Sequence, residues 1–207
     1  QTNWDYISRK DHNIDFGDIK TYVNYLYDYD TILNCVAYTQ TYDEDKTNSK
    51  KINYEAVASL SDYCTLTNKK LIHISTDYVY ANSTANANEE DLPLISPNWY
   101  TYYKLLADEY ILLKNKNFLI CRCSFKNKPF KYEKAWIDQV GNFDYVNVIS
   151  ELIIKLIKYN ATGLYNVGTE LKSIYDLAYK TKSDVIPVLK PDFVPAVEKE
   201  FKKIIKR

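Results

Sequence analysis

Hydrophobic and polar residues follow one another in blocks along the first two thirds of the chain, and these blocks predict strands that alternate with helices. Short apolar runs rich in β-branched and aromatic residues predict strands; they lie at 4–8, 30–37, 70–75 and 118–123. Segments with apolar residues at helical spacing predict helices; they lie at 18–29, 49–68 and 97–115. This alternation favours right-handed crossovers and a doubly wound, parallel, Rossmann-like α/β sheet.

The pattern beyond residue 142 is shorter and more mixed. It predicts helices at 145–159 and 170–180, strands at 163–167 and 184–188, and a closing helix from about Pro195. We therefore expect two domains. An NAD(P)-binding Rossmann-like domain would cover residues 1–142, and a small mixed α/β cap that binds substrate would cover residues 143–207.

Charge and composition exclude several classes of protein. The 207 residues carry 27 Lys and Arg against 27 Asp and Glu, so a net charge of zero offers no basis for sequence-independent binding to nucleic acid. No apolar run approaches the roughly 18 residues needed to cross a bilayer. The four cysteines lie in apolar stretches and no signal peptide is visible, which favours a reducing cytoplasm. We expect neither nucleic acid nor membrane as a partner.

The first candidate site follows the strand predicted at 70–75. Ligands of such sheets bind beyond the carboxyl ends of the strands, where Ser75, Thr76, Asp77 and Tyr78 stand. They offer hydroxyls, a carboxylate and a phenol to a substrate. An ordinary Ser/Thr/Asp turn is the alternative interpretation.

The second candidate is the pair Tyr100 and Lys104, one helical turn apart and so on the same helix face. An ammonium at Lys104 would lower the pKa of the Tyr100 phenol and make it a proton donor near neutral pH. Because 21 of 207 residues are Tyr, the spacing alone carries no information. It occurs four times, in Tyr6/Lys10, Tyr42/Lys46, Tyr100/Lys104 and Tyr110/Lys114. Only Tyr100/Lys104 opens the helix that follows the Ser75–Asp77 strand end.

Taken together, these segments resemble the extended short-chain dehydrogenase/reductases, and within them the sugar-nucleotide reductases typified by dTDP-4-dehydrorhamnose reductase. The resemblance rests on Ile74–Tyr80, on 24 residues from Thr76 to Tyr100, on Lys104, on Asn34–Thr39 and on Asn53. It covers residues 4–125 well and residues 143–168 loosely. It implies NAD(P)H-dependent reduction of a 4-keto-6-deoxy nucleotide sugar for polysaccharide precursors.

The resemblance also implies roles for single residues. Thr76 would hydrogen-bond the substrate carbonyl, with Asp77 and Tyr78 beside it. Tyr100 would protonate the alkoxide, and Lys104 would lower the Tyr100 pKa and hold the nicotinamide ribose. The implied cofactor-binding residues are Arg9, Asp15, Phe16, Asn34, Val36, Ala37, Tyr38, Asn53, Ser75, Tyr100 and Lys104.

Two features concern the cofactor more closely. Arg9 stands where an NAD enzyme usually has an acidic residue. It could pair with a 2′-phosphate, which favours NADP over NAD. A solvated surface arginine is the alternative interpretation. None of the four glycines, Gly17, Gly141, Gly163 and Gly168, forms the glycine-rich turn that receives a pyrophosphate. We expect roughly thirty residues, one strand-turn-helix unit, to precede Gln1.

Alternatives remain open at this point. The same fold serves epimerases and dehydratases with tightly bound NAD, and also non-catalytic regulatory subunits. A homodimer is a further open alternative. We expect no metal site, because Cys121 and Cys123 are typical of packed core thiols, and we interpret His73 as a core histidine.

Overall fold

The computed structural model describes residues 3–81, 87–91, 93 and 98–194, and the chain divides into two compact units. The first unit comprises Gln1–His73 and Asn98–Phe118, and the second comprises Ile74–Pro97 and Leu119–Arg207. Each unit is described separately below.

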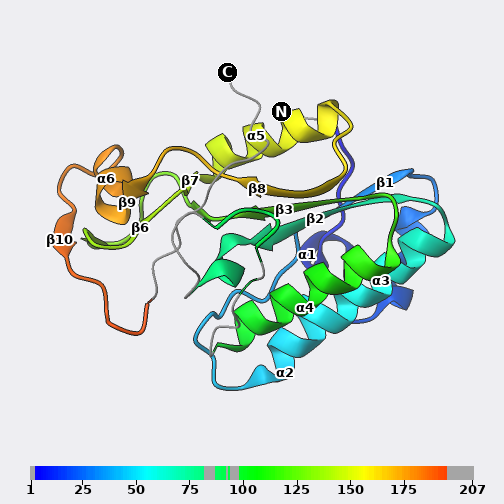
Figure 1. Ribbon diagram of the computed structural model, residues 1–207. Helices are drawn as coiled ribbons and strands as arrows, with labels where there is room; N and C mark the ends of the chain where they lie inside the picture. Colours follow the sequence, from blue (N-terminus) through cyan, green and yellow to red (C-terminus); the bar gives the residue numbers. More distant parts are fainter. Residues whose placement is uncertain (1–2, 82–86, 92, 94–97, 195–207) are drawn as a thin grey trace. The chain divides into compact units, whose positions relative to one another are not determined.

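The central sheet has the strand order β1-β2-β3-β8. Its strands are β1 (Thr31–Asn34), β2 (Lys70–Thr76), β3 (Phe118–Cys123) and β8 (Gly163–Val167), as Figure 1 shows. β1 pairs with β2 and β3 pairs with β8, both in parallel. The predicted parallel α/β sheet is thereby confirmed. β2 and β3 are almost wholly buried, which explains why their sequences do not alternate between apolar and polar residues.

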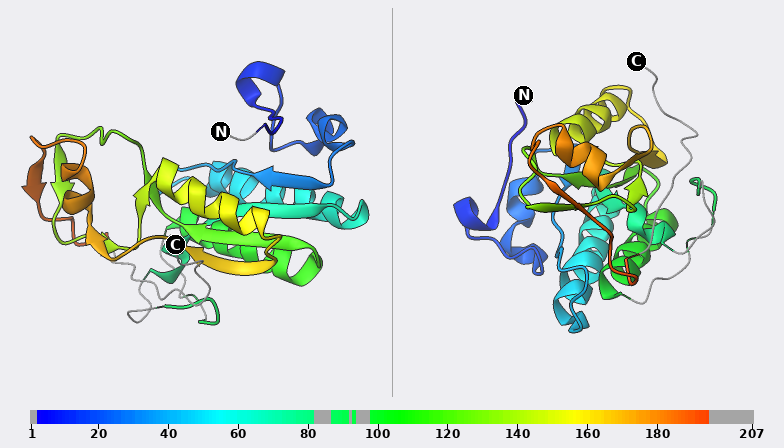
Figure 2. Two further views of the ribbon diagram at one scale, coloured as in Figure 1. Left: turned by 90° about the horizontal axis from the view of Figure 1, so that it is seen from above. Right: turned by 90° about the vertical axis from the view of Figure 1, so that its left-hand side faces the viewer.

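Long helices cover the strands of the first unit. α2 (Lys46–Ser49), the π-helical segment η3 (Lys50–Glu55) and α3 (Ala56–Leu66) form one continuous run, close to the predicted helix at 49–68. α4 (Trp99–Lys114) begins where the Asn98 side chain accepts a hydrogen bond from the Thr101 N–H. α3 and α4 lie side by side in Figures 1 and 2.

Two predictions for the start of the chain were wrong. Residues 4–8 form no strand: they are extended coil before the short helix α1 (Arg9–His12). A strand is stabilised by pairing with a neighbour, and no described segment pairs with residues 4–8. Residues 18–29 form two 3₁₀ turns, η1 (Ile19–Thr21) and η2 (Val23–Leu26), rather than one α-helix.

The predicted apolar face of residues 18–29 is nevertheless buried. Tyr22 and Leu26 lie in the core, where the Tyr22 ring stacks on Phe16. β-Branched and aromatic residues, which are poor formers of α-helix, occupy positions 19, 21, 22, 23 and 25. Two 3₁₀ turns therefore bury this face in place of one regular α-helix.

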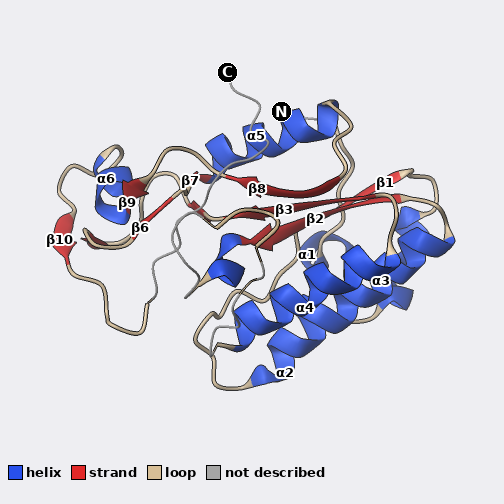
Figure 3. Ribbon diagram, in the orientation of Figure 1, coloured by secondary structure: helices blue, strands red, loops and turns tan. Residues whose placement is uncertain are grey.

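The second unit combines α5 (Val146–Lys158) with short strand pairs. These pairs are β4 (Phe125–Lys126) with β7 (Asp144–Tyr145), β5 (Lys134–Trp136) with β10 (Ile186–Val188), and β6 (Val140–Gly141) with β9 (Lys172–Ser173). Figure 3 distinguishes these strands from the helices. The predicted closing helix from Pro195 lies outside the described residues.

The predicted helix at 170–180 is shorter than expected, because α6 spans Ile174–Tyr179. Residues 172–173 pair in β9 instead. Ser173 then begins the helix through a capping box with Asp176, in which each residue's side chain bonds the other's backbone N–H. α6 buries Leu177 against Phe143 and Tyr145.

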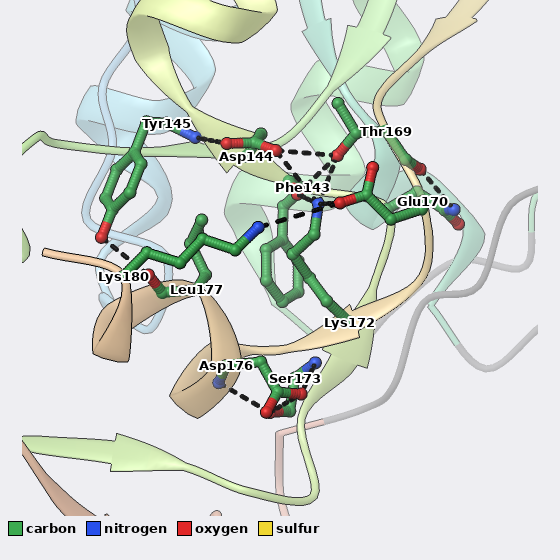
Figure 4. Close-up of polar contacts among 11 residues, drawn as sticks. Phe143, Asp144, Tyr145, Thr169, Glu170, Lys172, Ser173, Asp176, Leu177 and Lys180 are labelled. Carbon is green, nitrogen blue, oxygen red and sulfur yellow. Dashed lines mark hydrogen bonds and ion pairs between the residues drawn. The ribbon is translucent and has the colours of Figure 1, made fainter.

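A buried lysine joins the loops of the second unit. Lys172 Nζ donates to Asp144 Oδ2 at 3.0 Å, to the Phe143 carbonyl at 3.2 Å and to Thr169 Oγ1 at 2.5 Å (Figure 4). It also forms an ion pair with Glu170 at 3.0 Å. All four partners present oxygen atoms to the ammonium.

Within the described residues, no helix has the length and apolar character needed to cross a membrane. No group of three or more His, Cys, Asp or Glu side chains in that part of the chain is arranged to hold a metal ion. The four cysteines are free thiols.

Candidate active site

One face of α4 carries the expected catalytic residues Tyr100 and Lys104 and a third polar residue, Asp108. Tyr100, Lys104 and Asp108 follow one another at four-residue intervals and so share a helix face. Tyr100 is half-buried, whereas Lys104 is 1% exposed and Asp108 is fully buried. A buried lysine one turn from a half-buried phenol is an arrangement that tunes proton transfer.

The Lys104 amino group lies against a histidine on β2. Lys104 Nζ lies 3.1 Å from Nε2 of His73, and Asp108 Oδ1 lies 4.0 Å from the same nitrogen. On the other side of the ring, Nδ1 lies 3.1 Å from Nδ2 of Asn34, the residue that pairs with His73 in the sheet. Burial, and then the charge of Lys104 in its ammonium form, hold the pKa of His73 well below its usual value, so the ring is neutral.

The loop after β1 is fixed by two buried amides. Asn34 Oδ1 accepts from the Val36 N–H at 2.9 Å. Asn53, inside the π-helical segment, accepts from the Tyr38 N–H at 2.8 Å and donates to the Tyr38 carbonyl at 2.9 Å. π-Helical turns frequently mark functional sites. Val36 and Ala37 lie between these anchors, and their contact with a cofactor stays a prediction.

The residues expected near adenine and the 2′-phosphate make local contacts, and the charge of Arg9 also acts on Asp15. Asp15 accepts from Lys51 Nζ and from the Gly17 N–H, and these bonds, the Lys51 bond above all, lower the pKa of its carboxyl group. Phe16 is buried against Tyr22. Arg9 is exposed in α1. Their contact with a cofactor stays a prediction.

The strand end at Ser75–Tyr78 belongs to the second unit, where Ser75, Thr76 and Asp77 are buried. Thr76 Oγ1 accepts from the Tyr78 N–H at 3.2 Å and so begins the 3₁₀ turn η4 (Asp77–Tyr80). The turn interpretation therefore holds for Thr76, whose role toward a substrate stays a prediction. Lys126 lies within electrostatic reach of Asp77, and burial lowers the pKa of Lys126 although Asp77 opposes the shift.

Sequence analysis missed a buried arginine in the second unit. Arg122 is 2% exposed, its Nη1 donates to the Tyr80 hydroxyl at 2.8 Å, and its guanidinium lies 5.1 Å from the centre of the Tyr80 ring. An arginine inside the apolar strand 118–123 was the available signal, because a charge there needs a partner.

The structure brings together only part of the predicted site. Tyr100, Lys104 and Asn34 belong to the first unit, while Thr76 belongs to the second, and their assembly into one site stays a prediction. Sequence analysis gave His73 and Asp108 no role. His73 is buried as expected, but it makes a polar contact with Lys104. Asp108 could have been found from its position four residues after Lys104, which places both on one helix face.

The parallel sheet with helices between its strands defines a Rossmann-like α/β protein. The chain belongs to the RmlD substrate binding domain family, whose sequence profile matches residues 1–185.

Two curated relatives are similar to the chain. The spore coat polysaccharide biosynthesis protein SpsK of Bacillus subtilis is 27% identical over 172 residues, which are 73% of this chain and 60% of the relative. The probable low-salt glycan biosynthesis reductase Agl14 of Haloferax volcanii is 32% identical over 119 residues, 55% of this chain and 39% of the relative. The chain thus covers less than two thirds of the length of either relative.

Solved structures show the same fold. A dTDP-4-dehydrorhamnose reductase from Bacillus anthracis, in complex with NADP, superposes with a TM-score of 0.80 at 22% identity and covers 95% of this chain and 80% of its own. A hypothetical dTDP-4-dehydrorhamnose reductase from Sulfolobus tokodaii has a TM-score of 0.71 at 26% identity, with 93% and 72% covered.

Proposed function

We propose that this protein is an NAD(P)H-dependent reductase of a 4-keto-6-deoxy nucleotide sugar, of the dTDP-4-dehydrorhamnose reductase kind. The observation that carries the proposal is this face of α4, with Tyr100 half-buried and Lys104 buried against His73. The family and the polysaccharide and glycan roles named for its curated relatives support the substrate class.

The residues of the first unit fit the nicotinamide half of a dinucleotide. Lys104 and Tyr100 would hold the ribose, and the loop fixed by Asn34 and Asn53 would line it. The residues that would receive the pyrophosphate are not among the glycines of this sequence. When bound, the cofactor supplies the hydride that reduces the substrate carbonyl.

The protein's own residues supply the proton and the orientation. Thr76 holds the carbonyl oxygen, and Tyr100 gives its phenolic proton to that oxygen as negative charge develops. Lys104 stabilises the phenolate that remains, because a cation within about 4–6 Å favours the charged form of an acid. Asp77 and Tyr78 complete the substrate contacts.

We also propose that residues 1–142 bind the cofactor and that residues 143–207 form the cap over the substrate. Arg9 and Lys10 are exposed cations at the start of the chain, and they favour NADPH through the extra phosphate.

The test is cofactor oxidation by the full-length protein with dTDP-, UDP- and GDP-4-keto-6-deoxysugars. We expect reduction with a modest preference for NADPH that Arg9→Ala removes. Tightly bound NAD that never exchanges would point to an epimerase or dehydratase. No oxidation, together with altered activity of a co-purifying enzyme, would point to a regulatory subunit and end the proposal.

A further inference from the structure

The contacts of the His73 ring constrain the charge of Lys104. Asn34 Nδ2 faces ring atom Nδ1, and Lys104 Nζ faces ring atom Nε2, each at 3.1 Å. The Asn34 amide is oriented by its oxygen, which accepts from the Val36 N–H at 2.9 Å. A neutral imidazole has one donor nitrogen and one acceptor nitrogen.

In this arrangement the ring proton has to be on Nε2. An amide nitrogen only donates, so Nδ1 of His73 must accept, and Nε2–H then points at Lys104 Nζ. An ammonium has no lone pair to accept with, whereas an amine has one. The two ring contacts of His73 are therefore both satisfied only when Lys104 is an uncharged amine.

Protonation of Lys104 reverses this pattern. One proton from water converts Nζ to an ammonium, which needs Nε2 as its acceptor, so the ring proton moves to Nδ1 and the ring stays neutral. Nδ1–H then needs an acceptor, which Asn34 provides by turning its amide oxygen toward the ring. The Val36 N–H thereby loses its acceptor. Asn34, His73 and Lys104 are each at most 3% exposed, whereas Val36 is 41% exposed, so the freed Val36 N–H is left for water or a ligand to bind.

We propose that His73 and Asn34 are positioning residues that couple the charge of Lys104 to the Val36 N–H at the end of β1. The proposal rests on the proposed function, in which the ammonium form of Lys104 tunes Tyr100 and Val36 lines the cofactor. The charged form of Lys104 is then also the form that offers a backbone N–H to a cofactor oxygen.

Three further titratable groups face this network. Asp108, from the same helix as Lys104, lies 4.0 Å from Nε2 and favours the ammonium when ionised. Tyr100 lies one helical turn before Lys104. Cys35, from the loop after β1, interacts electrostatically with Lys104, and desolvation raises the pKa of its thiol, which keeps it neutral.

The test is NMR of the full-length protein without cofactor or substrate. The 207 residues contain two histidines, and His73→Leu assigns the ring signals of the relevant one. In a titration from pH 10 downward we expect the His73 proton to move from Nε2 to Nδ1. The Val36 amide proton should shift upfield with the same midpoint, because it loses its hydrogen bond.

Two lysine variants provide matched controls. Lys104→Met should hold the His73 proton on Nε2 and abolish the Val36 titration, whereas Lys114→Met, on an exposed site of the same helix, should leave both in place. A ring that keeps one tautomer throughout, or a Val36 shift with a different midpoint, would overturn the coupling. The NMR test needs no substrate, so it is independent of the reductase assay. A protein whose His73 tautomer changes but which reduces no substrate refutes only the proposed reductase. An active reductase whose His73 tautomer never changes refutes only the coupling.

Discussion

Lys104 of the first unit and Lys172 of the second are both buried, yet their partners differ in kind. Lys172 meets oxygen atoms of two carboxylates, a hydroxyl and a carbonyl, all of which accept hydrogen bonds from its Nζ or pair with its charge. Lys104 meets an imidazole nitrogen that can either give or take a proton. Burial alone therefore does not distinguish a structural lysine from a reactive one, whereas the chemistry of the partner does.

The largest expected effect is on turnover through Lys104. Lys104→Met in the full-length protein should lower kcat/KM by about 10²- to 10⁴-fold, the usual worth of general acid catalysis, with little change in melting temperature. Loss of the cation raises the Tyr100 pKa, so the alkaline limb of the pH profile should move upward. Steady-state kinetics across pH checks this. Lys114→Met is the control, and an equal loss there would contradict the role of Lys104.

Lys172→Met should instead lower stability. The change leaves the Asp144 carboxylate, with an 11% exposed side chain, without its cation, which should cost about 3 kcal/mol of unfolding free energy. Urea unfolding of the variant and wild type measures this difference. Turnover per folded molecule should be kept. An unchanged urea midpoint would show that Lys172 does not hold the loops as the contacts indicate.

The stability difference between wild type and Lys172→Met should also depend on pH. Burial raises the pKa of Asp144, but the Tyr145 N–H, Lys172 and Thr169 outweigh it, so the pKa lies below the usual 3.8. A lowered carboxyl pKa stabilises the fold above the unfolded-state pKa, and this contribution is lost as pH falls through the folded-state pKa. The difference should therefore be full at pH 6 and should shrink as the pH falls below 3.8, through the lowered pKa of Asp144. Urea midpoints at intermediate pH values check this, and a difference that grows in acid would contradict the sign.

Elements that depend on their own sequence pattern were predicted well. The strand Phe118–Cys123 was found at the predicted residues, because a strand buried on both faces is a continuous apolar run. Residues 4–8 carry a similar pattern and form no strand, since a strand also needs a neighbour that its own sequence does not reveal.

Sequence patterns could predict those site residues that lie within one segment, but not the contacts between residues from different segments. Tyr100 and Lys104 could be selected by helix position and by family resemblance. The contact of Lys104 with His73 joins residues 31 positions apart, so no local pattern shows it. Arg122 and Tyr80 were missed for the same reason, because their hydrogen bond joins residues 42 positions apart.

The most direct test of the proposed reductase is Tyr100→Phe beside Tyr110→Phe in the full-length protein. Both changes remove one phenolic hydroxyl from α4, but the Tyr110 hydroxyl bonds the exposed carboxylate of Asp62 and has no role in the chemistry. NADPH oxidation with a nucleotide-4-keto-6-deoxysugar should be abolished in Tyr100→Phe, while NADPH binding and the fold persist, and Tyr110→Phe should turn over like wild type. Full turnover by Tyr100→Phe, or an equal loss in Tyr110→Phe, would contradict the assignment of Tyr100 as proton donor.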